Sequence, residues 1–353
     1  MISFLFVWLL FCLFSFTQQD LNLTFYHNIF SAFQHFGYYY RPLNTFIFIV
    51  LSILLILVYF KLLKSGFSKF WLLIIPAIFS YPLFSFDIFN YLFNAKMVLI
   101  YQANPHIKTA LDFAWDPMLR FMHNVTTPAP YAYGWTIFSL LPGLAWFTGK
   151  FTLVFWLMKL FIVCFWLLTL KVLRQLVTAL FPKELWRWWL FALNPLVLVE
   201  TLINGHNDIV MVFFALQSYW LLMQSQKTRS IFLLVISASI KYVTILLLPF
   251  YFLKSKLAKL DLPTVFAIIL TLAMFTRPDQ LHSWYLIWAF SFAVLSRHRF
   301  WISLFTALTL GGLLRYAPYL YFGNWDPPVY LLRNLIWGVS LLLTPLIQRY
   351  LLK

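Results

Sequence analysis

The chain has 353 residues, of which 63% are hydrophobic and only 10% are charged, and its formal net charge is +16. A soluble domain has about a quarter of its residues charged, so these few charges cannot cover a water-exposed surface. The excess of Lys and Arg is typical of the cytoplasmic loops of a membrane protein and gives no support to nucleic-acid binding. Cys12 and Cys164 lie in separate apolar runs and are interpreted as small hydrophobic residues.

Long apolar runs recur from end to end and are suited to crossing the ~30 Å hydrocarbon layer of a bilayer. They do not alternate polar and apolar residues, which excludes a β-barrel and leaves helices as the spanning elements. We predict an all-α fold, a polytopic transmembrane bundle of about 10–12 helices that forms one domain over 1–353. The predicted spans are 2–17, 43–60, 70–86, 151–172, 188–203, 209–224, 263–276, 284–296, 300–316 and 329–347.

Three regions of the chain break the simple pattern of spans. Residues 134–148 are apolar but contain Pro142 and Gly143, and we interpret them as a juxtamembrane or re-entrant helix. They belong to a predicted extracytoplasmic loop over 87–150 with juxtamembrane helices inserted in it. The stretch 230–253 has basic residues at both ends, which predicts two half-helices that meet near Lys241.

Acidic residues provide a check on this topology, because they were not used to choose it. With the N-terminus in the cytoplasm, only Glu184 and Asp261 lie on the inner side. The other eight acids lie on or near the outer face: Asp20, Asp87, Asp112, Asp116, Glu200, Asp208, Asp279 and Asp326. The sequence therefore predicts a multi-pass protein of a bacterial cytoplasmic membrane, with a polar outer face.

The first candidate for chemistry is Asp87, which directly follows an apolar run. Partial loss of hydration raises the proton affinity of a carboxylate, so Asp87 can act as a general base. Tyr91 and Asn94 share its helical face by their spacing, and Lys96 follows. This polar stripe suits a hydroxyl-rich substrate. An interfacial helix with its polar face in water, capped by Asp87, is the alternative.

The second candidate is the segment from Glu200 to Asp208, a short outer hairpin. Glu200 stands within an apolar helix, where a carboxylate needs a partner or a wet cavity. His206 and Asp208 can bind a phosphate, a sugar hydroxyl or a metal, and Asn207 is a further candidate for substrate binding. A metal site is the weaker interpretation, since one His with scattered carboxylates lacks a ligand spacing, and we predict no metal and no cofactor. A hydrogen-bonded turn remains an alternative for His206.

Two further segments supply cations and aromatic rings. Lys241 stands with Tyr242 among apolar residues, where a lysine needs a counter-charge such as a phosphate, or else extends to the interface. A second outer hairpin contains charged and aromatic candidates for substrate binding, which could equally form an aromatic belt: Arg277, His282, Trp284 and Tyr285. Acids and cations that lie at one face suit glycosyl transfer from a lipid-phosphate sugar. The base would take a proton from the acceptor hydroxyl, and the cations would stabilise the leaving phosphate.

These segments resemble the GT-C superfamily of integral-membrane glycosyltransferases, and most closely the bacterial polyprenyl-phosphate-mannose-dependent mannosyltransferases. The likeness covers about 80–290 and depends on the order of short motifs. They are Asp87 and Tyr91 with Asn104-Pro105; Pro130-Tyr131-Ala132-Tyr133-Gly134; Asn194-Pro195 with Glu200 and Gly205-His206-Asn207-Asp208; and Lys241-Tyr242 with Pro249, Trp284-Tyr285 and Trp288. Asp87 here follows the third helix, and the second motif has an additional Ala132-Tyr133.

The resemblance implies a polyprenyl-phosphate hexose donor, with mannose as the sugar, used on the extracytoplasmic face. It implies a glycan or glycolipid acceptor, no nucleotide sugar and no required metal, and a membrane-lipid environment. By the same analogy, Asp87 serves as general base, with Glu200 and Asp208 as further catalytic candidates. The alternative function is a membrane transporter or a flippase for lipid-linked sugars, because broken helices and intramembrane charges serve those too.

Overall fold

The computed structural model describes residues 2–23, 27–63, 65–67, 69–253, 259–276 and 281–352. Over these residues the regular structure is entirely helical, which confirms the predicted all-α bundle. The α-helices are α1 Ile2–Phe14, α2 His27–Tyr39, α3 Arg41–Leu63, α4 Trp71–Phe79, α5 Asp87–Leu99, α6 Tyr133–Gly143, α7 Phe151–Leu180, α8 Trp186–Ala192, α9 Pro195–Leu198, α10 Asp208–Met223, α11 Lys227–Ile240, α12 Leu248–Leu253, α13 Leu262–Met274, α14 Leu286–Ala293, α15 Arg299–Leu314, α16 Ala317–Phe322, α17 Val329–Ser340 and α18 Thr344–Leu352.

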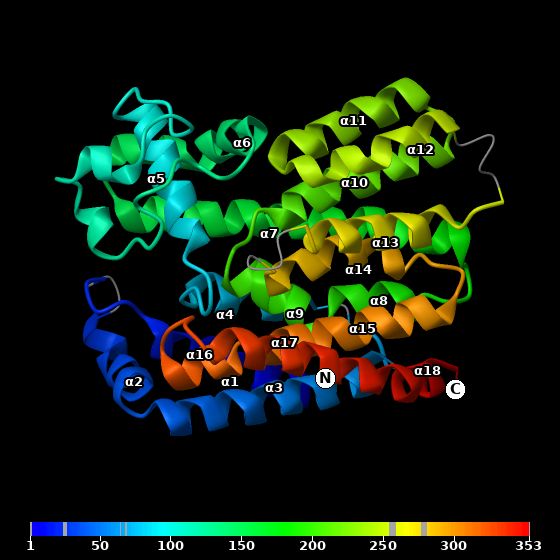
Figure 1. Ribbon diagram of the computed structural model, residues 1–353, viewed down its shortest axis with the longest axis horizontal. Coiled ribbons are helices and arrows are strands. Elements are labelled where there is room, and N and C mark those ends of the chain that lie inside the picture. The colour runs from blue at the N-terminus through cyan, green and yellow to red at the C-terminus, as the bar shows by residue number, and fades with distance from the viewer. Residues whose placement is uncertain are drawn as a thin grey trace.

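Four helical stretches of the described chain are long and apolar enough to cross a bilayer: Arg41–Leu63, Phe151–Leu180, Arg299–Phe322 and Val329–Leu351. A further pair, Pro195–Ile203 and Asp208–Met223, meets at an angle of 117°. Shorter apolar helices cover Ile2–Gln18, Tyr242–Leu253 and Leu262–Met274. In Figure 1 most of these helices run along the same direction, as expected of a transmembrane bundle.

Two predicted spans are wrong as continuous helices. Leu193 and Asn194 interrupt 188–203 between α8 and α9, and α4 ends at Phe79 within 70–86. Pro82 disfavours helical backbone at the residue before it and removes an N–H donor. The Lys159 ammonium donates to the carbonyl oxygens of Ala77 at 2.6 Å and Ser80 at 2.7 Å, so the acceptors at the helix end are satisfied. The chain from 80 to 86 then passes to α5 without helical structure.

The segment 87–150 forms a lobe at one end of the bundle, as Figure 1 shows for α5 and α6. Short 3₁₀ turns at Ala110–Phe113 and Pro117–Arg120 lie between these two helices, and a third at Leu144–Thr148 follows α6. The 134–148 stretch is thus a short helix and a turn, in agreement with the prediction of a segment that does not span. Its place outside the cytoplasm stays a prediction.

The break predicted near Lys241 is present. α11 ends at Ile240, Lys241 has extended backbone with φ −142° and ψ 125°, and a 3₁₀ turn over Tyr242–Leu247 leads into α12. In Figure 1 α11 and α12 lie side by side above α10. Lys241 is both the residue at which the helix is interrupted and the residue whose ammonium group contacts Asp208 of α10.

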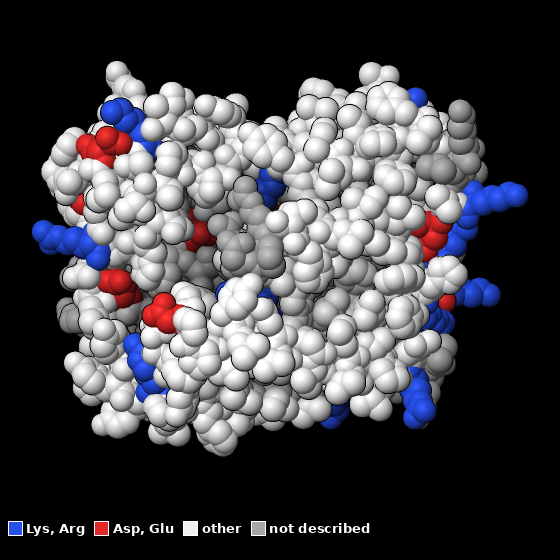
Figure 2. Space-filling view, in the orientation of Figure 1, with Lys and Arg blue, Asp and Glu red and all other residues white. Residues whose placement is uncertain are grey.

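Charged side chains are concentrated at the two ends of the bundle in Figure 2. Most acidic atoms visible on this face lie at the end that carries α5 and α16, and basic side chains project at both ends, including the end where α18 finishes. The surface between them is almost free of charge. An uncharged belt of this kind is what a surface facing lipid requires.

Candidate active site

The turn between the 199–203 helix and α10 places His206 inside the protein. Asn194 caps the start of α9 by accepting the N–H groups of Leu196 and Val197, and Pro195 occupies the first helical position. After a π-helical turn over Val199–Ile203, Gly205 adopts φ +72°, a value that favours glycine. The His206 N–H then donates to the Glu200 carbonyl at 3.0 Å, so the imidazole is directed back into the bundle.

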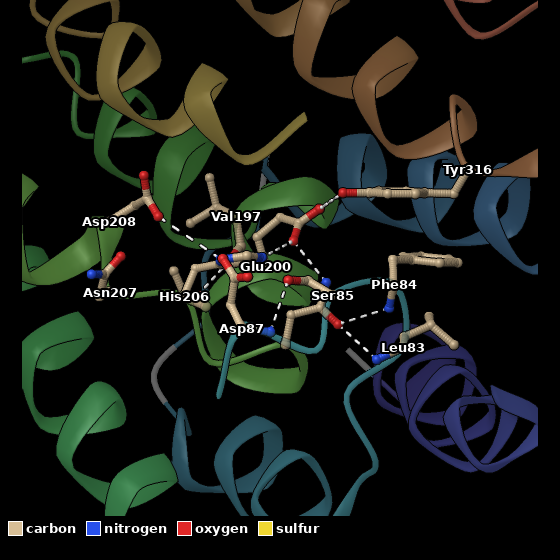
Figure 3. Close-up of polar contacts among 12 residues, drawn as sticks. Leu83, Phe84, Ser85, Asp87, Val197, Glu200, His206, Asn207, Asp208 and Tyr316 are labelled. Atoms are coloured by element: carbon tan, nitrogen blue, oxygen red, sulfur yellow. Dashed lines mark hydrogen bonds and ion pairs between the residues drawn. The ribbon is translucent and has the colours of Figure 1, made fainter. Parts of the chain in front are cut away.

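Three carboxylates surround the fully buried His206 ring. Its Nε2 lies 3.3 Å from Glu200 Oε2, and its Nδ1 lies 3.6 Å from Asp87 Oδ2 and 3.9 Å from Asp208 Oδ2. Figure 3 shows Asp87 and Asp208 converging on the imidazole from two sides. The structure thus brings together three residues from two segments that the sequence separates by more than a hundred positions, as the predicted site requires.

Glu200 is completely buried and its two oxygens are occupied. The Tyr316 hydroxyl donates to Oε1 at 2.7 Å, and the Asn204 amide donates to Oε2 at 2.7 Å. Asn204 also accepts the N–H of Leu83 at 2.7 Å, which ties the irregular 80–86 segment to this turn (Figure 3). A fully buried carboxylate with both oxygens engaged in this way cannot reach a substrate.

Asp208 is equally buried and forms an ion pair with Lys241. Both carboxylate oxygens lie 2.7 Å from Lys241 Nζ, and the Trp288 indole N–H donates to the same carboxylate. The Lys241 side chain is 14% exposed. An ammonium group has three N–H donors and Asp208 engages at most two of them, so one remains for a ligand.

Asp87 differs from the other two acids because 16% of its side chain is exposed, whereas theirs is fully buried. Its backbone N–H donates to Ser85 Oγ at 3.3 Å at the start of α5. Burial raises the pKa of the Asp87 carboxyl above its ordinary value, against the opposing effects of His206 and Lys241. It is the carboxylate of this cluster that a substrate can contact.

Aromatic rings line the cluster on the side of the 281–293 segment. Trp284 stacks between His206 and His282, with ring centroids 4.2 Å from each. Tyr285 and Trp288 have centroids 5.4 Å and 5.6 Å from Lys241 Nζ, within cation–π range.

His282 lies outside the spanning helices. Burial lowers the pKa of His282 to about 3, and neighbouring cations act in the same direction. His282 therefore contributes a neutral ring, rather than the positive charge expected from the sequence.

Two close contacts hold the 130–135 segment against the site. The Tyr91 ring packs edge-on against Tyr131 and Trp135, with centroids 4.9 Å and 4.8 Å away, and its hydroxyl accepts the Asn207 N–H at 3.4 Å. Gly134 approaches the end of α11 so closely that a Cβ atom there would lie 2.1 Å from Ser239 Oγ. Glycine is therefore required for α6 to reach the junction before Lys241.

Three of the predicted substrate-binding residues that the structure describes do not join this cluster. Lys96 pairs with the buried Asp116 and lies 4.8 Å from the Trp146 ring centroid, so its charge serves the packing of the lobe. Tyr242 is 66% exposed on the outside of the break. Asn94 lines a separate hollow with Asn90. Arg277 lies outside the described residues.

The sequence reasoning missed Arg315 and Tyr316. Arg315 is buried and donates to the carbonyls of Leu281 at 3.1 Å and Arg333 at 3.2 Å and to Asn334 Oδ1 at 2.9 Å. Among the described residues it has no carboxylate partner. An arginine inside an apolar run is a functional candidate by default, a signal that could have found it. The tyrosine had no such signal.

Metal coordination finds no ready site in the described part of the chain, where no group of three or more His, Cys, Asp or Glu side chains is arranged to hold an ion. Around His206 the carboxylates instead face imidazole, ammonium, amide and hydroxyl groups. These groups can stabilise ionised carboxylates by hydrogen bonds or opposite charge. The arrangement can place one accessible carboxylate and one accessible cation beside a substrate.

Comparison with known proteins gives one finding. The family described as alpha-(1->6)-mannopyranosyltransferase, N-terminal domain, matches residues 55–255, which is more than half of the chain and contains Asp87, Glu200, His206, Asp208 and Lys241. No curated protein and no solved structure gave a match. The resemblance stated from the motifs is confirmed, and a glycosyltransferase is favoured over a transporter. The chain belongs to the alpha-(1->6)-mannopyranosyltransferase family and is a GT-C type membrane mannosyltransferase.

Proposed function

We propose that this protein transfers a mannosyl residue from a polyprenyl-phosphate carrier to a hydroxyl group of a glycan or glycolipid acceptor. Asp87 is the general base, and the reaction takes place on the extracytoplasmic face of a bacterial cytoplasmic membrane. The observation that carries the proposal is the pairing of one partly exposed carboxylate, Asp87, with one partly exposed cation, Lys241, around the buried His206–Asp208 core.

The chemical step needs both of these groups. The acceptor oxygen forms a bond to the anomeric carbon while the bond from that carbon to the phosphate oxygen breaks. Asp87 takes the acceptor proton, and the phosphate leaves with the bonding electron pair. Base catalysis of this kind contributes about 10²–10⁴-fold, and a fixed cation at the leaving oxygen stabilises the charge that develops there.

Lys241 is the first candidate to hold the phosphate, through the N–H that Asp208 leaves available. Arg315 adds a second positive charge behind the 281–284 segment, to which it is bonded through the Leu281 carbonyl. The neutral His282 ring offers hydrogen bonds without adding charge. Together these groups favour an anionic head group over a neutral one.

Glu200 and Asp208 are assigned positioning roles in this proposal, in place of the catalytic roles suggested from the sequence. Both side chains are fully buried, and their oxygens already accept hydrogen bonds from Tyr316, Asn204, Trp288 and Lys241. Asp208 orients Lys241 through two contacts of 2.7 Å, and Glu200 places its carboxylate 3.3 Å from the His206 ring.

The extracytoplasmic location is supported by the distribution of charge. The site includes Asp87 at the start of α5, and α5 belongs to the end of the bundle where most of the visible acidic side chains gather (Figures 1 and 2).

The proposal is tested by donor choice. Purified protein in liposomes is given either polyprenyl-phosphate [³H]mannose or GDP-[³H]mannose, together with an α-mannoside acceptor. We expect labelled product from the lipid-linked donor only. Labelling from GDP-mannose alone would overturn the assignment of the donor. In vesicles of known orientation, product should form only when the acceptor is on the side that corresponds to the outside of the cell.

A further inference from the structure

The chain enters α5 through residues 80–86, which have no helical structure. Asp87 is the first residue of α5, and the first N–H groups of a helix have no partner inside it. The Asp87 N–H donates instead to Ser85 Oγ at 3.3 Å, within this segment. The position of the proposed base therefore depends on the contacts that hold 80–86 against the bundle.

The buried Phe84 side chain of this segment contacts rings from two other parts of the chain. The Tyr316 ring stacks on it, with centroids 3.9 Å apart and ring planes 5° apart. Phe48 of α3 meets it edge-on, with centroids 5.1 Å apart. Aromatic pairs of these kinds stabilise a structure beyond the area that they bury. They hold Phe84 against α3 and against the junction of α15 with α16.

The hydroxyl end of Tyr316 reaches the turn that precedes α10. It donates to Glu200 Oε1 at 2.7 Å, and the Asn204 amide donates to Glu200 Oε2 at 2.7 Å. Asn204 Oδ1 in turn accepts the N–H groups of Leu83 at 2.7 Å and Phe84 at 3.3 Å. These contacts close on themselves: the carboxylate and the amide connect the Tyr316 hydroxyl to the Phe84 backbone, and the two stacked rings connect the same residues again (Figure 3).

Tyr316 joins the two segments that supply the carboxylates of the site. Its ring contacts the segment that leads to Asp87, and its hydroxyl contacts the segment that contains Glu200 and Asp208. It comes from the C-terminal part of the chain, beyond the 55–255 region that matches the family. Because the side chain is only 3% exposed and its hydroxyl is engaged, it acts on the reaction through other residues.

We infer that Tyr316 is a positioning residue for Asp87, which it places by holding the 83–86 segment against the Glu200 turn through its ring and its hydroxyl. The inference rests on the proposed function, in which Asp87 is the base. Without the ring contact this segment is free to shift, and a misplacement of about 1 Å can lower the rate of a positioned reaction by about 10²-fold. Substrate binding should change little, because Tyr316 does not reach a substrate.

The first measurement is mannosyl transfer by Tyr316→Leu, Phe84→Leu and Tyr316→Phe, each corrected for the amount of folded protein found by gel filtration in detergent. We expect kcat to fall by about 10–10²-fold in the two leucine variants, with KM for donor and acceptor little changed. Tyr316→Phe keeps the stacked ring and should retain most of the rate. Tyr251→Leu is the matched control, because Tyr251 is also buried, with its hydroxyl 3.0 Å from Ser218 Oγ, and this variant should transfer like the wild type.

A double variant separates positioning of Asp87 from a general loss of structure. Since Tyr316 acts through Asp87, adding Tyr316→Leu to Asp87→Asn should lower the residual rate no further, measured with labelled donor at high enzyme concentration. If Tyr316→Leu prevents folding, Phe84→Leu removes the same ring contact and takes its place. An equal loss in both backgrounds, or wild-type kcat in both leucine variants, would overturn the inference and leave the proposed base intact. A wild-type rate in Asp87→Asn would overturn the proposed base and this inference with it.

Discussion

Replacing Lys241 by methionine removes the ammonium group and keeps most of the apolar stem. In the wild type, Asp208 is fully buried and receives two contacts of 2.7 Å from Lys241 and one hydrogen bond from Trp288. Without the ammonium group a carboxylate remains in the interior with a single donor and His206 at 3.9 Å. Breaking a buried ion pair on one side costs about 3–5 kcal/mol, which is the loss of unfolding free energy that we expect for Lys241→Met.

A second substitution tests the reason for that loss. Asp208→Asn in the Lys241→Met protein removes the unpaired charge, so most of the lost stability should return in the double variant. Transfer activity should not return, because the cation proposed to hold the donor phosphate is still missing. The assay is unfolding in mixed micelles with increasing denaturing detergent, alongside mannosyl transfer, for the wild type, Lys241→Met and the double variant. A fully stable Lys241→Met protein, or an active double variant, would refute this reasoning.

Three further predictions concern other parts of the site. Lys159→Met should lower the unfolding free energy by about 1–3 kcal/mol, because the acceptors at the end of α4 lose their donor, while the exposed Lys150→Met should have little effect in the same assay. Gly134→Ala should lower transfer, because its Cβ would lie 2.1 Å from Ser239 Oγ, whereas Gly338→Ala, with nothing within 4 Å, should not. The rate of transfer should fall as the pH falls through the raised pKa of Asp87, because the base must be ionised. A wild-type rate that stays constant down to the ordinary pKa range of a carboxylate would count against this prediction, and so would a pH–rate profile that Asp87→Glu leaves unchanged.

The helical bundle and its main break could be predicted because the bilayer restricts the possible structures. Long apolar runs in lipid must be helices, and the basic residues on both sides of 230–253 required a return near Lys241, where the backbone is extended. The early end of α4 had one local signal, Pro82, inside the apolar run that was interpreted as a span. The group that satisfies the acceptors at this end, Lys159, comes from a distant helix, and local hydrophobicity contains no information about such a partner.

The candidate site was predictable as a set of residues but not as a set of roles. Asp87, Glu200 and Asp208 do meet at His206, as their positions at one end of the bundle suggested. Which of these carboxylates a substrate can contact depends on the exposed fraction of each side chain. That fraction is set by neighbouring atoms from other segments, so it cannot be read directly from the sequence. Lys96 illustrates the limit, because its partner Asp116 lies on an irregular loop whose path no periodicity specifies.

Asp87 is the residue on which the chemistry proposed here depends. The most direct measurement is the rate of mannosyl transfer by Asp87→Asn at saturating polyprenyl-phosphate mannose and α-mannoside acceptor, with binding of mannobiose measured on the same sample. We predict a rate lower by about 10²–10⁴-fold with unchanged binding, because the amide occupies the same space but cannot accept the acceptor proton. A rate equal to that of the wild type would contradict the assignment of Asp87 as the base.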